Sequence, residues 1–146
     1  MLEAKKVLVP VNGNETDATI IELAAMTAKR YKGRIYAIHV IEVSRTLPVD
    51  ADLVEERQRA DTILDKAEQT AGHWNQDIET EILQARDIGT AIVEEAIESK
   101  ADLIIVGVPY RADFGEFDLG KTAAHVLKYA PCEVWVCRTP PVTKSK

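Results

Sequence analysis

Short apolar runs and longer amphipathic stretches alternate strictly along this chain of 146 residues. Each apolar run has the length of a β-strand, and each stretch between two runs repeats its apolar residues at helical spacing. The strand-like runs are 5–11, 34–43, 77–84, 101–107 and 132–138. This alternation predicts an α/β fold, in which a five-stranded parallel sheet is joined by right-handed crossovers and carries helices on both faces.

The pattern indicates a single domain over residues 1–139, followed by a flexible C-terminal tail over 140–146 that has no core pattern.

The ends of several helices can be predicted from capping residues. Asn14 or Thr16 can cap the first helix, and Gly33 is placed to end it in the left-handed conformation. The second helix is expected at 50–71, and Asp87 can cap the third. The alternation in 77–84 is typical of a half-buried strand near the edge of a sheet.

Composition and charge narrow the function classes. Apolar residues make up 46% of the chain, its net charge is −6, and no basic patch stands out. A nucleic-acid partner is therefore not expected. No apolar run approaches the length of a membrane span, and the first residues lack the pattern of a secretory signal. We expect a cytoplasmic protein with no direct membrane insertion.

Two glycines frame a candidate anion site. Gly107 ends the fourth strand-like run, and Gly120 opens the last helical stretch. Backbone N–H groups at a helix N-terminus can bind an anion, and the carboxyl ends of parallel strands are where α/β sheets bind ligands. The string 115–122 (GEFDLGKT) also satisfies the P-loop pattern. Seven residues separate this string from Gly107, and it carries two acids inside the supposed phosphate cradle, so a P-loop NTPase is disfavoured.

With these motifs the chain closely resembles a universal stress protein (UspA-like) domain, from Lys6 to Arg138. The segments that carry the resemblance are VLVPVNGNE, IYAIHV, ADLIIVG and GKTAAHVLKYAPCEVWVCR. The resemblance implies a Rossmann-like sheet, of the adenine nucleotide alpha hydrolase type, with strand order 3-2-1-4-5. It also implies regulation of partners in a stress response.

ATP-binding members of the family carry a glycine motif that this chain matches only in part. The first and third glycines fall on Gly107 and Gly120, whereas the second falls on Tyr110. Lys121 stands at the serine or threonine position, with Thr122 one residue later. The adenine-side contacts fall on Val11, Asn12 and Val40, and ATP binders usually have aspartate where this chain has Asn12. The full candidate nucleotide-binding set is Pro10, Val11, Asn12, Val40, Val106, Gly107, Tyr110, Arg111, Gly120, Lys121, Thr122 and Ala123.

The departures leave the ligand open. Tyr110 adds bulk and could stack on a base or fill the site, while Asn12 loses a charge but keeps hydrogen-bonding capacity. Arg111 and Lys121 suit ATP, another adenine nucleotide or a cyclic dinucleotide, with Mg²⁺ as an accompanying ion. A family member that binds no nucleotide is the other outcome.

Three functions remain open at this point. The first is a non-catalytic regulatory module that forms a homodimer through the fifth strand, at Val134, Trp135 and Val136, where pairing would cover an apolar edge. The second is a regulatory domain acting with a membrane transporter. The third is a slow ATPase, for which the candidate acids are Asp113, Glu116 and Asp118. We expect that the protein is not an enzyme and that it holds no resident metal.

Overall fold

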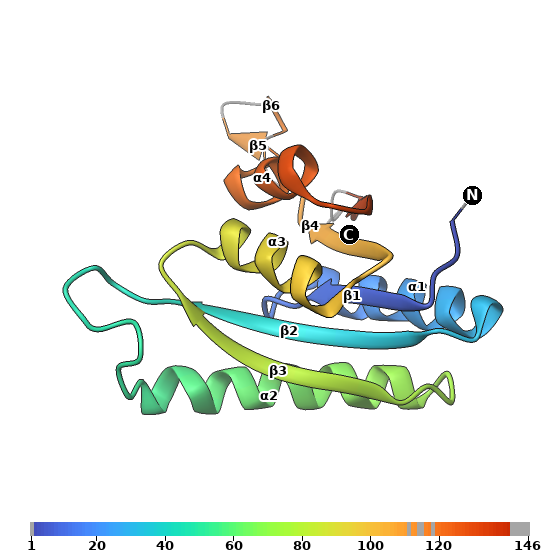
Figure 1. The fold of residues 1–146 in the computed structure, drawn as a ribbon, viewed down its shortest axis with the longest axis horizontal. Coiled ribbons are helices and arrows are strands. Elements are labelled where there is room, and N and C mark those ends of the chain that lie inside the picture. Colours follow the sequence, from blue (N-terminus) through green and yellow to red (C-terminus); the bar gives the residue numbers. More distant parts are fainter. Residues whose placement is uncertain (1, 111, 114–115, 118, 141–146) are drawn as a thin grey trace, which may run out of the picture.

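The computed structural model describes residues 2–110, 112–113, 116–117 and 119–140. Five parallel strands form one sheet in the order β3-β2-β1-β4-β7 (Figure 1). This arrangement confirms the 3-2-1-4-5 order, with β7 as the fifth strand of the sheet. The strands are β1 (Lys6–Pro10), β2 (Arg34–Glu42), β3 (Ile78–Ala85), β4 (Leu103–Val108) and β7 (Glu133–Arg138), and the helices are α1 (Thr16–Tyr31), α2 (Val54–Gly72), α3 (Ile88–Ser99) and α4 (Lys121–Tyr129).

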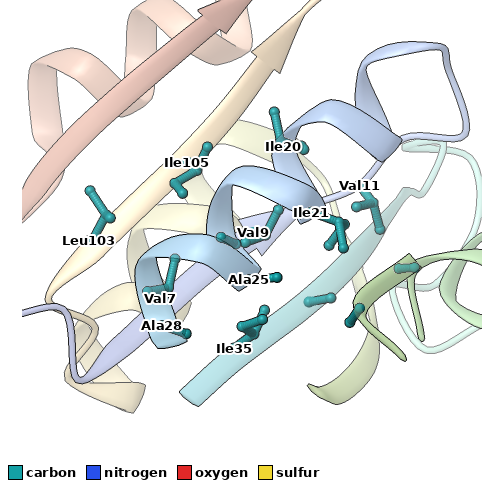
Figure 2. Packing of buried hydrophobic residues seen from close by; sticks show 14 of the residues in the cluster. Val7, Val9, Val11, Ile20, Ile21, Ala25, Ala28, Ile35, Leu103 and Ile105 are labelled. Carbon is teal, nitrogen blue, oxygen red and sulfur yellow. The ribbon is translucent and has the colours of Figure 1, made fainter. Parts of the chain in front are cut away.

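Helices cover both faces of the sheet, as the alternation predicts. On one face α1 and α2 enclose a core with alternate residues of β1, and Figure 2 shows Val7, Val9 and Val11 lying against α1. On the other face α3 and α4 pack on Leu8 and Ile104. Both β1 and β4 are buried on both sides, which explains why their sequences are almost continuously apolar.

An additional hairpin follows β4. Its two short antiparallel strands are β5 (Ala112–Asp113) and β6 (Glu116–Phe117). The sequence predicts only a loop here, because two residues per strand are too few to give a periodic signal. Figure 1 places this hairpin beyond α4, away from the main sheet.

The structure selects among the expected helix ends. Glu15 directly precedes α1 and makes no side-chain cap, and Thr16 is the first residue of the helix. Asn14, one residue earlier, satisfies an N–H of the first turn, because its Oδ1 accepts the Thr16 backbone N–H at 2.9 Å. The prediction that Gly33 takes the left-handed position after α1 is wrong, since Lys32 does so with φ 53°. Gly33 is required for another reason: a Cβ there would lie 2.0 Å from the Ala4 carbonyl oxygen. The second helix begins at Val54, four residues later than expected.

In the part of the chain that the structure describes, no helix combines the length and apolar character needed to cross a bilayer.

Candidate functional site

The predicted site residues gather at the carboxyl edge of the sheet. β1 pairs in parallel with both β2 and β4, so the ends of these three strands lie side by side. The strand order also reverses beside β1, which is the switch point where open α/β sheets bind ligands. The structure thereby brings the ends of β1, β2 and β4 together, and with them Pro10, Val11, Asn12, Val40, Val106 and Gly107.

The apolar members of this set do not share one face. Val40 and Val106 belong to the core under α3 and α4, as does Ala123 of α4. Val11 instead is fully buried in the core under α1 and α2. A ligand on the α3/α4 side would meet Val40 and Val106, whereas the side chain of Val11 points to the opposite side of the sheet.

Protein groups hold the backbone of the loop after β1, where the resemblance places the adenine-side contacts. The Val11 N–H donates to the Ile38 carbonyl at 2.8 Å, and the ring Nδ1 of His39 lies 2.7 Å from the Val11 carbonyl oxygen. Since a carbonyl only accepts, the Nδ1 of His39 carries the proton. The backbone of Val11 is therefore occupied by the protein on both its N–H and its C=O.

Asp17 holds the next two residues. Its Oδ1 accepts the Asn12 N–H at 3.0 Å, and its Oδ2 accepts the Gly13 N–H at 2.7 Å. Burial raises the pKa of the Asp17 carboxyl above its usual value, and these two hydrogen bonds offset part of that rise. The sequence offered a signal for this contact: Asp17 comes three residues after the capping Asn14, the spacing of a capping box.

Gly13 completes this loop. Its φ of +86° is a conformation that favours glycine, and a Cβ would lie 2.8 Å from the Ile63 Cδ1 of α2. The loop after β1 is thus fixed by two side chains, Asp17 and His39, and by a glycine turn.

Gly107 lies where the motif requires a glycine, and the structure gives it a packing role. A Cβ at this position would lie 2.5 Å from the Thr16 Oγ1 and 3.1 Å from the Ile20 Cγ2. The missing side chain lets the first turn of α1 approach β4. Two requirements can therefore explain a glycine at position 107: the ligand motif and the close packing of α1 against β4.

Tyr110 follows β4 by two residues. The Arg138 guanidinium at the end of β7 lies 5.1 Å from the centre of its ring, and the register pairs Val108 with Arg138. This cation–π contact orients the Tyr110 ring toward β7. Arg111, also a candidate site residue, lies outside the described residues.

The start of α4 has an open geometry. Gly120 precedes the helix with φ 84° and ψ 154°, and a Cβ there would meet no heavy atom of the described chain within 4 Å. Lys121 is exposed and Thr122 partly buried in the first turn. Backbone N–H groups and a lysine thus stand together at the positive end of a helix, an arrangement that favours an anion.

The N-terminal end of α3 lies beside α4. A Cβ at Gly89 would lie 3.0 Å from the Cβ of His125, so these helices are in close contact. Asp87 caps α3, as predicted, by accepting the Thr90 N–H at 2.9 Å. The two Thr90 hydrogen bonds lower the pKa of the Asp87 carboxyl, and the charges of His125 and Lys121 lower it further. The carboxylate of Asp87 therefore lies within the electrostatic influence of Lys121. The glycine motif gives no sign of this acid.

The fifth strand, β7, lies at the edge of the sheet. Val134, Trp135 and Val136 are each partly buried, and the Trp135 Nε1 donates to the Glu133 carboxylate at 2.7 Å. Trp135 packs against the α1/α2 core, and the two valines against the α3/α4 core. Their alternation leaves an outer strand edge with apolar side chains on both faces.

The candidate acids for hydrolysis are only partly described. The hairpin contains Asp113 in β5 and Glu116 in β6, of which only the backbone is described, and Asp118 lies outside the described residues. Across the described positions, no three His, Cys, Asp or Glu side chains gather in a way that could hold a metal ion.

Several solved structures with the same fold are universal stress proteins. One from Archaeoglobus fulgidus is 22% identical with a TM-score of 0.78, covering 90% of this chain and 96% of that one. A second from the same organism, in complex with dAMP, is 18% identical with a TM-score of 0.74, covering 92% and 98%. A family protein from Arabidopsis thaliana with AMP bound is 18% identical with a TM-score of 0.66, covering 93% and 92%.

The sequence comparisons agree. A universal stress protein of Methanocaldococcus jannaschii is 32% identical over 145 residues, which cover 93% of this chain and 83% of that protein. The model of the Universal stress protein family matches residues 3–138, nearly the full length of the chain. The chain belongs to the universal stress protein family.

Proposed function

We propose that this protein is a non-catalytic regulatory module that binds an adenine nucleotide at the carboxyl edge of its sheet and acts in the cytoplasm on partners in a stress response. The observation that carries the proposal is the start of α4. There Gly120 takes a positive φ of 84° with no heavy atom of the described chain within 4 Å of its Cβ position, next to the exposed Lys121. Similar folds in complex with dAMP and with AMP support the choice of an adenine ligand.

The two ends of the ligand would meet different chemistry. The phosphate groups would approach the N–H groups of the first turn of α4 and the charge of Lys121. The base would lie toward Val40 and the Asn12 side chain. Mg²⁺ would enter with the phosphates of ATP rather than from a protein site, because Mg²⁺ commonly binds through substrate phosphates.

The same proposal includes a homodimer paired through β7. Antiparallel pairing of two β7 strands would cover the edge formed by Val134, Trp135 and Val136, which otherwise presents unpaired backbone groups and apolar side chains. The two-fold symmetry of such a pair makes the contact self-complementary.

Calorimetric titration with AMP and ATP, each with and without Mg²⁺, tests the proposal. We expect saturable binding of at least one nucleotide, and its loss in Gly120→Val, where a branched side chain enters the space beside α4. Gly72→Val, at the end of α2, is the control for added bulk, because no heavy atom of the described chain lies within 4 Å of its Cβ position. Gly72 lacks the positive φ of Gly120, so thermal unfolding of both variants is measured beside the titration to show whether backbone strain alone lowers binding.

Absence of binding by the wild-type protein would refute the nucleotide proposal. Equal binding by the wild type and Gly120→Val would place the ligand elsewhere. Sedimentation of the same preparation at micromolar concentration tests the dimer, and a monomer would refute that part.

A further inference from the structure

Asp17 makes contacts that the family motif does not explain. Its side chain spans back from α1 to the loop after β1, and its two oxygens accept one N–H each, from Asn12 and from Gly13. We propose that Asp17 is a positioning residue for the nucleotide site: its carboxylate fixes the loop so that the Asn12 side chain faces the base. This inference rests on the proposed function and adds to it how the base side is held.

The hydrogen bonds of the loop support this role. Val11 uses its N–H and C=O within the protein, and the N–H groups of Asn12 and Gly13 are taken by Asp17. Within the described residues, the Asn12 side chain makes no hydrogen bond, and Asn12 is exposed. The backbone of the segment is thus occupied, and the Asn12 amide is the polar group that it offers to a ligand.

The carboxylate occupies an unfavourable place for a charge. Burial raises the pKa of Asp17, and Glu15 raises it as well, whereas the nearby His39 lowers it. From α2, Lys66 and His73 line the same hollow of about 440 Å³ between α1 and α2 that Asp17 borders. The pKa of Asp17 is raised overall, so burial outweighs the hydrogen bonds from Asn12 and Gly13 and the charge of His39.

The sign of the pKa shift separates positioning from stability. Because its pKa is raised, Asp17 binds its proton more tightly in the folded state than in the unfolded chain. The contribution of this proton to the free energy of unfolding is fully present below the usual pKa of 3.8 and is lost as pH rises through the raised value. At neutral pH the ionised form therefore costs stability relative to the protonated form. The hydrogen bonds that the carboxylate accepts from Asn12 and Gly13 give a reason for keeping a charge at this cost, because they hold the loop after β1.

The first arm of the test compares Asp17→Asn with Glu15→Gln by AMP calorimetry at pH 7.5. Both variants remove one negative charge from the same helix start, but only the first removes an acceptor from the loop, because an amide nitrogen would face an N–H. We expect AMP affinity to fall about tenfold in Asp17→Asn, as the binding-competent loop becomes a minor population, and to change less than about twofold in Glu15→Gln. Asp17→Glu, which keeps the carboxylate, should recover part of the loss.

Thermal unfolding at the same pH separates this role from a structural one. The midpoint of Asp17→Asn is expected within about 4 °C of the wild type, since the variant also removes the cost of the buried charge. A fall in affinity accompanied by a large fall in the midpoint would instead show a structural residue and overturn the inference.

The second arm uses pH. AMP affinity of the wild type should fall as pH falls through the raised pKa of Asp17, and this part of the profile should vanish in Asp17→Asn. The phosphate of AMP titrates near pH 6 with either protein, so the difference between the two profiles isolates Asp17. The amide resonances of Asn12 and Gly13 in the wild type should shift with the same midpoint, which keeps the test valid even where the variant does not fold.

The outcomes are distinct from those of the proposed function. If the wild type binds no nucleotide, the proposed function fails. If the wild type binds AMP and Asp17→Asn binds it equally with the same pH profile, the proposed function stands and the inference on Asp17 is overturned.

Discussion

The two sides of the candidate site are built in opposite ways. We call the loop after β1 the base side and the start of α4 the phosphate side, after the ligand groups proposed for them. On the base side, Asp17 and His39 hold the backbone of the loop after β1. On the phosphate side, Gly120 opens α4 with no heavy atom of the described chain near its Cβ position, and Lys121 is exposed. In the proposed function this difference is a division of labour, in which the held loop would recognise the shape of the base and the start of α4 would offer N–H groups and charge to the phosphate.

The two motif glycines show the same contrast, because one lies in tight packing and the other in an open place, and substitution by alanine should separate them. A Cβ at Gly107 lies 2.5 Å from the Thr16 Oγ1, so Gly107→Ala should lower the free energy of unfolding by about 3 kcal/mol through overpacking. Gly120→Ala meets no heavy atom of the described chain within 4 Å and carries the backbone strain of φ 84° and ψ 154°, about 2 kcal/mol. Urea unfolding of both variants measures the difference.

AMP titration of the same two proteins completes this test. Gly120→Ala should weaken binding at intact fold, whereas Gly107→Ala should lose affinity only to the extent that the fold loosens. Equal losses of stability in the two variants would show that the packing contact of Gly107 with α1 is not what requires a glycine there.

The sequence predicted the sheet well because its evidence is local and repeated. Val7, Leu8 and Val9 of β1 lie in a run too apolar for anything but a strand buried on both faces, and the alternation of strands and helices then leaves few topologies. Helix ends were harder to predict. Lys32 and Gly33 are neighbours, and only the close approach of Ala4, a contact distant in sequence, explains why the glycine occupies the second of the two positions.

The strand ends that form the candidate site could be predicted from the sequence, but the contacts around them could not. The carboxyl ends of β1 and β4 follow from topology, and Gly107 and Gly120 from their motif. That Val11 faces the opposite side of the sheet from Val40 depends on the register of β1 with β2. The sequence shows for Asp17 only the spacing of a capping box after Asn14. That spacing does not predict that the carboxylate reaches the N–H groups of Asn12 and Gly13.

Charge on the phosphate side gives the next largest effect. Lys121→Gln removes a positive charge at the start of α4, and we expect AMP affinity to fall roughly fivefold, about 1 kcal/mol. Lys128→Gln, which removes the same charge in the last turn of the helix, is the matched control and should change affinity little. Raising the salt concentration should narrow the gap between the wild type and Lys121→Gln, because an exposed charge is screened.

Adenosine in place of AMP sharpens this measurement. It lacks the phosphate, so Lys121→Gln should bind adenosine as the wild type does. A loss of adenosine binding in this variant would place Lys121 near the base and would contradict the assignment of the two sides.

The smallest effect concerns Asp87, whose carboxyl is influenced by the charge of Lys121 at the start of α4. Its pKa is lowered, chiefly by the hydrogen bonds from Thr90, so its ionised form stabilises the folded state above the usual pKa of 3.8, and this contribution is lost as pH falls through the lowered value. Asp87→Asn keeps a capping oxygen for Thr90 and removes only the charge. Because Asp87 is exposed, we expect the free energy of unfolding to fall by only about half a kcal/mol at neutral pH, and this loss should disappear in acid.

AMP affinity of Asp87→Asn should rise slightly at the same time, since a negative charge near Lys121 is gone. Urea unfolding at neutral and acidic pH, with AMP titration at neutral pH, measures both changes. A fall in AMP affinity would mean that Asp87 helps to hold the ligand and that the phosphate side, like the base side, depends on a carboxylate.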